Sequence, residues 1–411
     1  MQNLGAPLFA QVELTERCNH SCHYCANPFA LKRKGDSLSE KSLKRIIDQT
    51  LDNNIFSILL TGGEPFLNKN GLSFALSYLD GKPIEVCLNT NLSLPLNEAD
   101  LARIKRITFT LVSFPSYNEE IFKEITERNS YSDVLNNLER LASHAVNFGI
   151  NQVITQKNKA SVYETGKFLY NQFKISNFSA SPFITVRKED IPLSLSKSEI
   201  ILVADDLLRL EKETGMKTDI LSCIPACFFP ERLTEHRMAN HVCDAGRSTI
   251  MISPKGFVRK CSSLEDNYGN ILEEDLKTIW TRIVSSNKPL NKLCDDCDLT
   301  KECYGGCEKR ALLYGVDPLI CDLPKTSKNR YLNLDSEKKY SIKDFRWRQE
   351  LEGILISDGS GFVSGNSALL QVMQELKGKK FGLKRIRETM GQEGENLFTY
   401  LYNRGLVKDE I

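Results

Sequence analysis

The sequence lacks the features that mark several classes of protein. None of its 411 residues falls in an apolar run approaching the roughly 20 residues needed to span a bilayer. Residues 1–10 have no charged segment followed by an apolar one, so no secretory signal is indicated. Basic and acidic residues, 54 and 53, nearly cancel to a net charge of +1, which gives no electrostatic support for binding nucleic acid or a membrane. We therefore expect a cytoplasmic chain with neither partner.

Cysteine, by contrast, is abundant, with 13 residues. In a reducing compartment, cysteines are more often metal ligands or catalytic groups than disulfide partners. Three of them cluster near the N-terminus, Cys87 stands alone in a strand-like run, nine lie between Cys223 and Cys321, and none follows. This grouping predicts metal-binding segments on separate domains, whereas Cys87 fits a small buried apolar side chain.

Short apolar runs alternate with helical patterns over the first 200 residues or so. This alternation predicts an α/β fold with a parallel sheet and right-handed crossovers. About six strand–helix units fit, fewer than the eight of a closed barrel. The strand-like runs are 7–14, 55–60, 84–88, 107–112, 150–154 and 178–180, and the clearest helical patterns are 118–127, 133–148, 161–173 and 196–214.

The pattern changes twice further along the chain. Residues 223–324 are short-looped and cysteine-rich, and 325–345 are polar and lysine-rich, as in a linker. In the tail, apolar runs at 351–357 and 361–364 flank Asp358-Gly359, a hairpin signal. Helical faces follow, the last of them ending near Gly405. The tail therefore predicts a small α+β domain of winged-helix type.

Cys18-x3-Cys22-x2-Cys25 is the sharpest motif in the chain. Three thiolates on one tight loop can hold three irons of a 4Fe–4S cluster, which leaves the fourth iron open to a small chelating molecule. An incomplete zinc site is the alternative. His20 and His23 lie inside this loop, and solvated loop histidines are a simpler interpretation of them than functional groups.

A second motif, Gly62-Gly63-Glu64, directly follows a strand-like run. Adjacent glycines let the backbone approach a ligand closely, and Glu64 supplies a carboxylate for an ammonium group. Together the two motifs resemble the radical S-adenosylmethionine (SAM) superfamily, over about residues 7–200. The resemblance implies a partial (β/α)6 TIM-like barrel with its cluster at the carboxyl edge of the strands. It also implies that Gly62, Gly63 and Glu64 hold the SAM amine, that Tyr24 lies against the adenine, and that Ser113 helps to bind SAM.

The same resemblance implies a radical mechanism. A reduced cluster, supplied by an electron donor such as flavodoxin or ferredoxin, cleaves SAM to methionine and a 5′-deoxyadenosyl radical, which abstracts hydrogen from an unactivated C–H bond. The cofactor carries the difficult chemistry, while the protein positions the reactants and excludes water. The sequence identifies no residue that moves protons at the substrate.

The later cysteines have a regular spacing. Zinc would use four of them and leave three, and structural disulfides are a further alternative. The full spacing resembles a SPASM domain, the auxiliary-cluster extension of many radical SAM maturases. By that resemblance Cys294, Cys297, Cys303 and Cys321 bind a distal cluster, and Cys243, Cys261 and Cys307 bind a proximal one. The nearest cysteines that could complete the proximal site are Cys227 and Cys223. Either Cys227 closes this site, which we expect, or the site keeps an open iron that contacts substrate. With the SAM-binding cluster this gives three 4Fe–4S clusters.

The tail resembles the peptide-binding recognition elements of ribosomal-peptide maturation systems, in which a leader peptide adds a strand to the hairpin edge. A module that only packs against the enzyme is the alternative. The resemblances imply four segments: a radical SAM core (1–205), a SPASM domain (206–324), a linker (325–345) and a winged-helix-like peptide-recognition domain (346–411).

These features predict a peptide maturase that abstracts hydrogen from a residue of a ribosomally made precursor peptide, giving a thioether or carbon–carbon crosslink or an oxidised residue. Two alternatives stay open. One is a related enzyme that matures sulfatases or dehydrogenates a sugar or small alcohol. The other is a non-catalytic iron–sulfur sensor with a winged-helix output, although a sensor needs no SAM motif.

Overall fold

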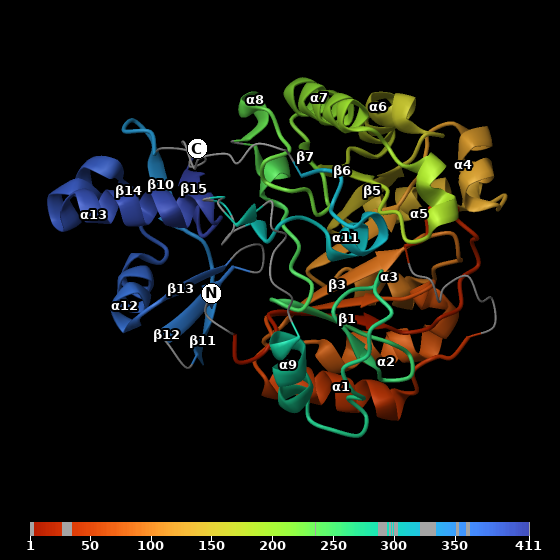
Figure 1. Ribbon diagram of the computed structural model, residues 1–411, viewed down its shortest axis with the longest axis horizontal. Helices are drawn as coiled ribbons and strands as arrows, with labels where there is room; N and C mark the ends of the chain where they lie inside the picture. Colours follow the sequence, from red (N-terminus) through yellow and green to blue (C-terminus); the bar gives the residue numbers. More distant parts are fainter. Residues whose placement is uncertain are drawn as a thin grey trace. The chain divides into compact units, whose positions relative to one another are not determined.

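The structure of the chain is a computed structural model. It describes residues 4–26, 35–234, 236–286, 294, 295, 297, 299, 303–320, 334–350, 353–358 and 362–410. The chain forms two compact units, Ala6–Lys325 and a second that joins Met1–Gly5 to Thr326–Ile411 (Figure 1). Across the described ranges, no helix combines the length and the apolar character that a membrane crossing requires.

The larger unit is built on a sheet in which the first seven strands are parallel and lie side by side in chain order. Those strands are β1 (Phe9–Glu13), β2 (Ser57–Thr61), β3 (Glu85–Thr90), β4 (Phe109–Ser113), β5 (Phe148–Ile154), β6 (Asn177–Pro182) and β7 (Lys217–Asp219). The α/β partial barrel expected from the sequence is therefore confirmed, with β7 as an additional short strand. On the far side of β1 the sheet continues with β8 (Thr249–Ile252), which is parallel to β1, and β9 (Val258–Arg259), which is antiparallel to β8.

Helices connect these strands: α1 (Glu40–Asp52), α2 (Lys69–Leu79), α3 (Glu98–Ile104), α4 (Glu119–Thr126), α5 (Tyr131–Ser143), α6 (Val162–Phe173) and α7 (Lys197–Thr214). In α1 the Ser39 side chain accepts a hydrogen bond from the amide of Ser42, and the apolar side of the helix is buried. The helix expected over 133–148 ends at Ser143, because Ala145 is left-handed (φ 52°) and Phe148 already begins β5. The cysteine-rich part adds α8 (Glu231–Thr234), α9 (Leu276–Ser285) and α11 (Glu308–Tyr314).

Burial alternates along the central strands. In β3, Val86, Leu88 and Thr90 are buried, whereas Glu85, Cys87 and Asn89 are half-buried. Parallel strands in chain order with right-handed crossovers place their helices on one face, so the buried side chains meet the helices and the half-buried ones line the other face. Cys87 lies on that second face. The sequence predicted a buried side chain there, whereas Cys87 is half-buried.

The smaller unit has two antiparallel sheets of three strands each, in the orders β14-β10-β15 and β11-β12-β13. Its elements are β10 (Lys339–Ile342), β11 (Arg346–Glu350), β12 (Gly353–Ser357), β13 (Phe362–Gly365), α12 (Ser367–Leu376), β14 (Lys380–Gly382), α13 (Leu383–Asn403) and β15 (Val407–Glu410). The predicted hairpin is the β12–β13 pair. Helix α13 breaks at Gly391, whose φ is 65°.

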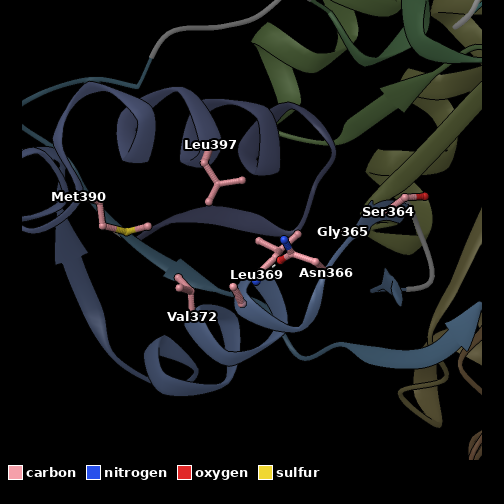
Figure 2. Close-up of a pocket in the computed structure, with 8 residues that line it drawn as sticks. Ser364, Gly365, Asn366, Leu369, Val372, Met390 and Leu397 are labelled. Carbon is pink, nitrogen blue, oxygen red and sulfur yellow. Dashed lines mark hydrogen bonds between the residues drawn. The ribbon is translucent and has the colours of Figure 1, made fainter. Parts of the chain in front are cut away.

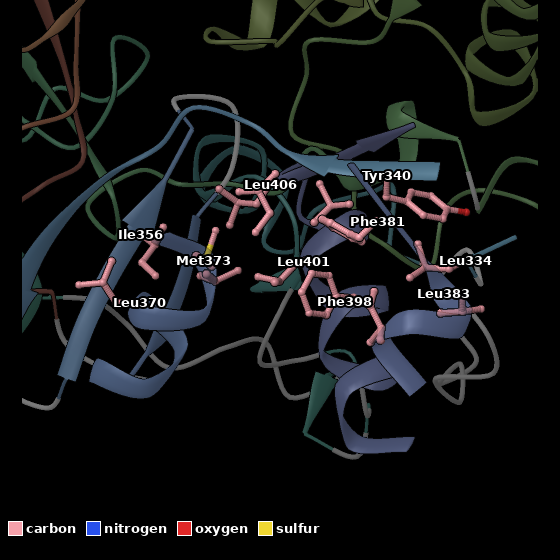
Figure 3. Packing of buried hydrophobic residues seen from close by; sticks show 14 of the residues in the cluster. Leu334, Tyr340, Ile356, Leu370, Met373, Phe381, Leu383, Phe398, Leu401 and Leu406 are labelled. Carbon is pink, nitrogen blue, oxygen red and sulfur yellow. The ribbon is translucent and has the colours of Figure 1, made fainter. Parts of the chain in front are cut away.

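The stretch expected to be a plain linker contains β10. Tyr340 and Ile342 alternate with polar residues along it, and both are buried in the core of the smaller unit (Figure 3). Lys339 is the one exposed residue of the strand, and Ser341 is buried. Phe398 and Leu401 of α13 and Met373 of α12 complete the centre of that core.

One buried ion pair ties the cysteine-rich segment to the barrel. Arg259 in β9 donates to the Glu13 carboxylate in β1 at 2.8 Å, and both side chains are less than 5% exposed (4% and 3%). Arg259→Met should lower the free energy of unfolding by about 3–5 kcal/mol, because it removes the positive charge that compensates the buried Glu13 carboxylate. The double variant Glu13→Leu/Arg259→Met should recover much of that loss in urea or thermal unfolding.

The matched control is Arg106→Met, which removes an exposed ion pair with Asp80. This substitution should lower the free energy of unfolding by less than about 1 kcal/mol. If Arg259→Met and Arg106→Met lowered the free energy of unfolding equally, the assigned role of the buried pair would be contradicted.

Candidate functional site

The loop after β1 carries Cys18, Cys22 and Cys25, and the turn after β2 holds it in place. The Gly63 amide donates to the Thr15 carbonyl, and the Glu64 amide donates to the Arg17 carbonyl, both at 2.8 Å. A Cβ atom on Gly63 would lie 2.0 Å from the Arg17 carbonyl oxygen. The Gly62-Gly63 pair therefore lets the turn pack directly on the backbone that leads into Cys18, a purpose the sequence did not reveal.

The far end of the loop is anchored on α4 and α5. The amides of Ser21 and His23 donate to the carbonyls of Thr126 (2.9 Å) and Ile125 (3.2 Å). His20 is buried, with its Nε2 atom 2.9 Å from the Ser130 hydroxyl. Burial, and then the Arg128 charge, lower the pKa of His20 to about 4. His20 is thus a neutral anchor rather than a solvated histidine.

Glu64 is buried and accepts hydrogen bonds from its own chain. Its carboxylate receives the Thr90 hydroxyl at 2.8 Å, the Asn91 amide at 2.7 Å and the Phe66 amide at 3.2 Å. Burial raises the pKa of Glu64 to about 7. A carboxylate has about four acceptor directions, so one direction is left for an ammonium group.

Through Asn91 this network reaches the cysteine loop. The Asn91 side-chain amide donates to the side-chain oxygen Oδ1 of Asn19 at 2.9 Å and lies 3.9 Å from the Cys18 sulfur. Thr90, Asn91 and Asn19 were not found by sequence reasoning. For Thr90 and Asn91 the only signal was the polar stretch that ends the β3 run, whereas Asn19 lies inside the cysteine loop itself.

The three loop cysteines are not joined by disulfides, and the thiolate charges of this set affect the pKa of Cys18 and of Cys22. Burial raises the pKa of Cys18 to about 12, with smaller contributions from Glu64 and Cys25. Burial and then the charges of Cys18 and Cys25 raise the pKa of Cys22. A metal deprotonates a thiol that it binds, so the raised pKa values of these thiols are compatible with a role as metal ligands. Among the residues that the structure describes, no group of three or more His, Cys, Asp or Glu side chains is arranged so that it could hold a metal ion.

Tyr24 lies within this loop, whereas Ser113 lies at the carboxyl end of β4. Tyr24 is half-buried, and burial followed by the neighbouring Cys22 thiol raises its pKa. Ser113 is the last residue of β4, on the half-buried face of the sheet, and is in register with Asn151 of β5.

A second group of thiols gathers four cysteines from distant parts of the sequence. The Cys223 thiol is hydrogen-bonded to Cys243 and interacts electrostatically with Cys307 and Cys261. That bond lowers the pKa of Cys243 to about 7, against the effect of burial. The structure therefore brings together the predicted set of Cys243, Cys261 and Cys307, and Cys223 joins them.

The third group contains Cys294, Cys297 and Cys303. Burial and then the neighbouring Cys303 and Cys297 raise the pKa of Cys294. The Ala226 amide donates to the Cys303 sulfur at 3.1 Å, and Cys227 is the next residue in the chain. Cys321, the fourth expected member, lies outside the described residues.

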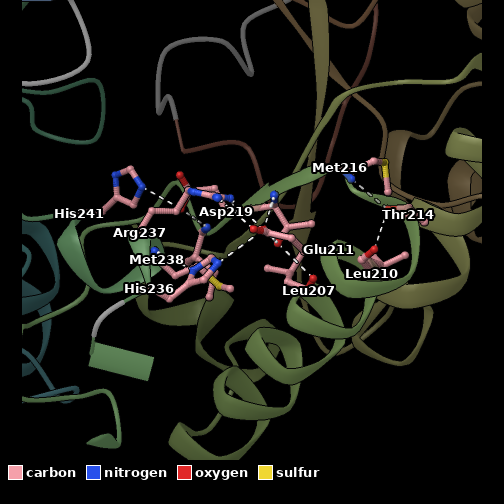
Figure 4. Close-up of polar contacts among 12 residues, drawn as sticks. Leu207, Leu210, Glu211, Thr214, Met216, Asp219, His236, Arg237, Met238 and His241 are labelled. Carbon is pink, nitrogen blue, oxygen red and sulfur yellow. Dashed lines mark hydrogen bonds and ion pairs between the residues drawn. The ribbon is translucent and has the colours of Figure 1, made fainter. Parts of the chain in front are cut away.

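The loop between Cys223 and Cys243 is held against α7 and β7 by ion pairs (Figure 4). Arg237 donates to both oxygens of Glu211, at 2.8 and 2.9 Å, a bidentate arrangement. His241 pairs with Asp219 at 2.8 Å. The Ile224 amide then donates to the His241 carbonyl at 3.2 Å, which brings the two ends of the loop together.

The smaller unit has a groove of about 680 Å³ beside β13 (Figure 2). Its walls are mainly apolar, with Leu369 and Val372 from α12 facing Met390 and Leu397 from α13. Ser364 and Gly365 of β13 form its border. Strand β13 pairs with β12 and stands at the end of its sheet, so its second edge faces no strand of that sheet.

A loop of three thiols at the carboxyl edge of a parallel partial barrel, held by a Gly-Gly-Glu turn, defines an enzyme class that combines an iron–sulfur cluster with SAM. The family model of the Radical SAM superfamily matches residues 12–169. Residues 12–169 thus form a radical SAM domain, and the chain is a radical SAM enzyme that uses SAM and a 4Fe–4S cluster.

Two known proteins and one crystal structure are similar to this chain. The chain is 26% identical to the antilisterial bacteriocin subtilosin biosynthesis protein AlbA of Bacillus subtilis, over 74% of this chain and 68% of AlbA. It is 32% identical to a GTP 3′,8-cyclase of Campylobacter lari, but over 35% of this chain and 44% of that protein. The crystal structure of Streptococcus suis SuiB bound to precursor peptide SuiA superposes with a TM-score of 0.64, at 18% identity, over 77% of this chain and 75% of SuiB. The SuiB likeness concerns the fold and extends beyond the residues of the family model.

Gly63→Ala tests how the turn positions the thiols. The added methyl group would displace the Arg17–Cys18 backbone, so the variant should lose about four irons per chain and form no 5′-deoxyadenosine from SAM. Gly382→Ala is the matched control, because a Cβ there would meet its nearest atom at 3.9 Å. A Gly63→Ala protein with full iron content and full SAM cleavage would contradict this role.

Proposed function

We propose that this enzyme modifies a ribosomally made precursor peptide, which it binds through its smaller unit. The observation that carries the proposal is the apolar groove beside the end strand β13. The named function of AlbA in bacteriocin biosynthesis and the precursor peptide bound to SuiB support a peptide substrate for this chain. The product would be a thioether, a carbon–carbon crosslink or an oxidised residue.

The groove fits an extended leader peptide. An added strand would take its backbone hydrogen bonds from β13, and its alternate side chains would point toward α12 and α13. Leu369, Val372 and Leu397 offer apolar contacts to those side chains. The occupant is therefore a peptide whose leader has apolar residues at every second position.

In the larger unit, Cys18, Cys22 and Cys25 would hold the SAM-binding cluster. When bound, cluster and SAM together supply a 5′-deoxyadenosyl radical that abstracts hydrogen from the peptide. Glu64 would orient the SAM amine with its remaining acceptor direction, and Tyr24 and Ser113 would border the cofactor. The half-buried polar face of the strands, with Ser113 and Asn151 in register, would position the reacting residue.

We further propose two auxiliary 4Fe–4S clusters, which would serve as electron acceptors. Cys294, Cys297, Cys303 and Cys321 would hold the distal one, and Cys243, Cys261 and Cys307 the proximal one. The hydrogen bond between Cys223 and Cys243 favours Cys223, instead of Cys227, as the fourth proximal ligand. Cys227 directly follows Ala226, whose amide donates a hydrogen bond to the sulfur of Cys303 in the distal set.

Val372→Asp tests the peptide site. A charge in the apolar groove should weaken binding of a fluorescent leader peptide, encoded by a short gene beside this one, by at least about tenfold. At limiting peptide concentration, the change in precursor mass that reports modification should disappear. SAM cleavage in the absence of peptide should stay at the wild-type rate. Gln374→Asp, at an exposed position of the same helix, is the control. Equal peptide binding by wild type and Val372→Asp would refute the proposed site.

Cys223→Ala and Cys227→Ala separate the two candidate ligands. Cys223→Ala should lower the iron content and alter the cluster spectra, because the proximal site would lose a ligand. Cys227→Ala should keep the iron content and spectra of the wild type. The reverse result would assign Cys227 to the proximal cluster, as the sequence suggested.

A further inference from the structure

A buried ion pair lies directly behind the four-cysteine group. Arg310 of α11 is 6% exposed and Asp317 is 1% exposed. The Nε and Nη2 atoms of Arg310 donate to the two oxygens of Asp317 at 2.9 and 3.0 Å. This bidentate geometry fixes the guanidinium in one orientation.

The pair connects two cysteines that are far apart in the sequence. The Cys307 amide donates to Asp317 at 2.6 Å, and Arg310 Nη2 donates to the Cys223 carbonyl. Gly306 leaves room for this contact, since a Cβ there would lie 2.3 Å from an Asp317 carboxylate oxygen. The guanidinium is therefore held between Cys223 and Cys307 on the protein side of the group.

The positive charge lies close to two of the cysteines. Arg310 donates to the Cys223 carbonyl, and the Cys307 amide donates to the Asp317 carboxylate that Arg310 also binds. The first cysteine loop has a buried group of the opposite sign, because the Glu64 carboxylate accepts a hydrogen bond from Asn91, whose side chain lies 3.9 Å from the Cys18 sulfur. Net charge and hydrogen bonds near the sulfurs set the reduction potential of an iron–sulfur cluster.

We propose that Arg310 is a positioning residue that raises the reduction potential of the cluster held by Cys223, Cys243, Cys261 and Cys307, above that of the cluster held by Cys18, Cys22 and Cys25. A fixed positive charge stabilises the more negative, reduced state of a cluster in a medium of low dielectric constant. The inference rests on the proposed proximal cluster. Other charged groups near it, the buried Lys260 paired with Glu308 and Asp244 beside Cys243, stay constant in the variants below.

Two substitutions with opposite expected signs test this role. Arg310→Gln removes the positive charge, so the proximal cluster should become harder to reduce. Asp317→Asn keeps Arg310 and removes its counter-charge, so the same cluster should become easier to reduce. Arg310→Lys keeps the charge and should stay closer to the wild type than Arg310→Gln.

The measurement is an anaerobic redox titration of the reconstituted full-length chain, followed by electron paramagnetic resonance, with an iron count for each sample. At the wild-type midpoint potential, the reduced-to-oxidised ratio of the proximal cluster should fall about tenfold in Arg310→Gln and rise in Asp317→Asn, where tenfold corresponds to about 59 mV for a one-electron couple. The cluster of Cys18, Cys22 and Cys25 serves as the internal reference and should not shift.

The signs distinguish a charge effect from a loss of structure. If the ion pair were only a structural clamp, both variants would loosen the site and shift the potential in the same direction, and that result would overturn the proposal. If Arg310→Gln fails to retain iron, the upward shift in Asp317→Asn still supports the proposal and its absence overturns it. A wild-type iron count that lacks the proximal cluster would instead refute the cluster itself, and the inference with it.

Discussion

The contact on which the first site depends is one between two stretches of backbone. Gly62 and Gly63 have no side chains, so the turn after β2 meets the carbonyls of Thr15 and Arg17 directly. Cys18 follows at once, and its position relative to the sheet is thereby fixed. Glu64, the next residue of the turn, extends this constraint to the end of β3 through Thr90 and Asn91. Strands β1, β2 and β3 thus converge on one loop of thiols.

The same sheet also positions the second thiol group. Strand β8 adds to β1 on the side opposite β2, and the buried Glu13–Arg259 pair holds β9 against it. Cys261 lies two residues beyond β9, so the barrel itself carries one member of the four-cysteine group. The thiol groups then differ in their charged neighbours, a carboxylate beside Cys18 and a guanidinium beside Cys307. A difference of this kind allows one chain to hold clusters of unequal potential.

Much of this was predictable from the sequence, and the reasons are local. Alternating strand and helix patterns predicted the parallel sheet, because hydrophobic periodicity reports burial on one face. The spacing of Cys18, Cys22 and Cys25 predicted the first site, since ligands on one loop are neighbours in sequence and in space. Strand β10 was missed because it has only four residues, in which Tyr340 and Ile342 alternate with the polar Lys339 and Ser341 inside a lysine-rich stretch. The Cys223–Cys243 contact and the Arg310–Asp317 pair depend on how loops fold back in three dimensions, which spacing along a chain does not encode.

We propose that the three groups of cysteines hold three iron–sulfur clusters. Iron and zinc counting with Mössbauer spectroscopy on the anaerobically reconstituted wild-type chain distinguishes clusters from a zinc module. About twelve irons per chain are expected, all in 4Fe–4S clusters, with little zinc. About four irons accompanied by stoichiometric zinc would contradict it, because the later cysteines would then form a zinc module rather than auxiliary clusters.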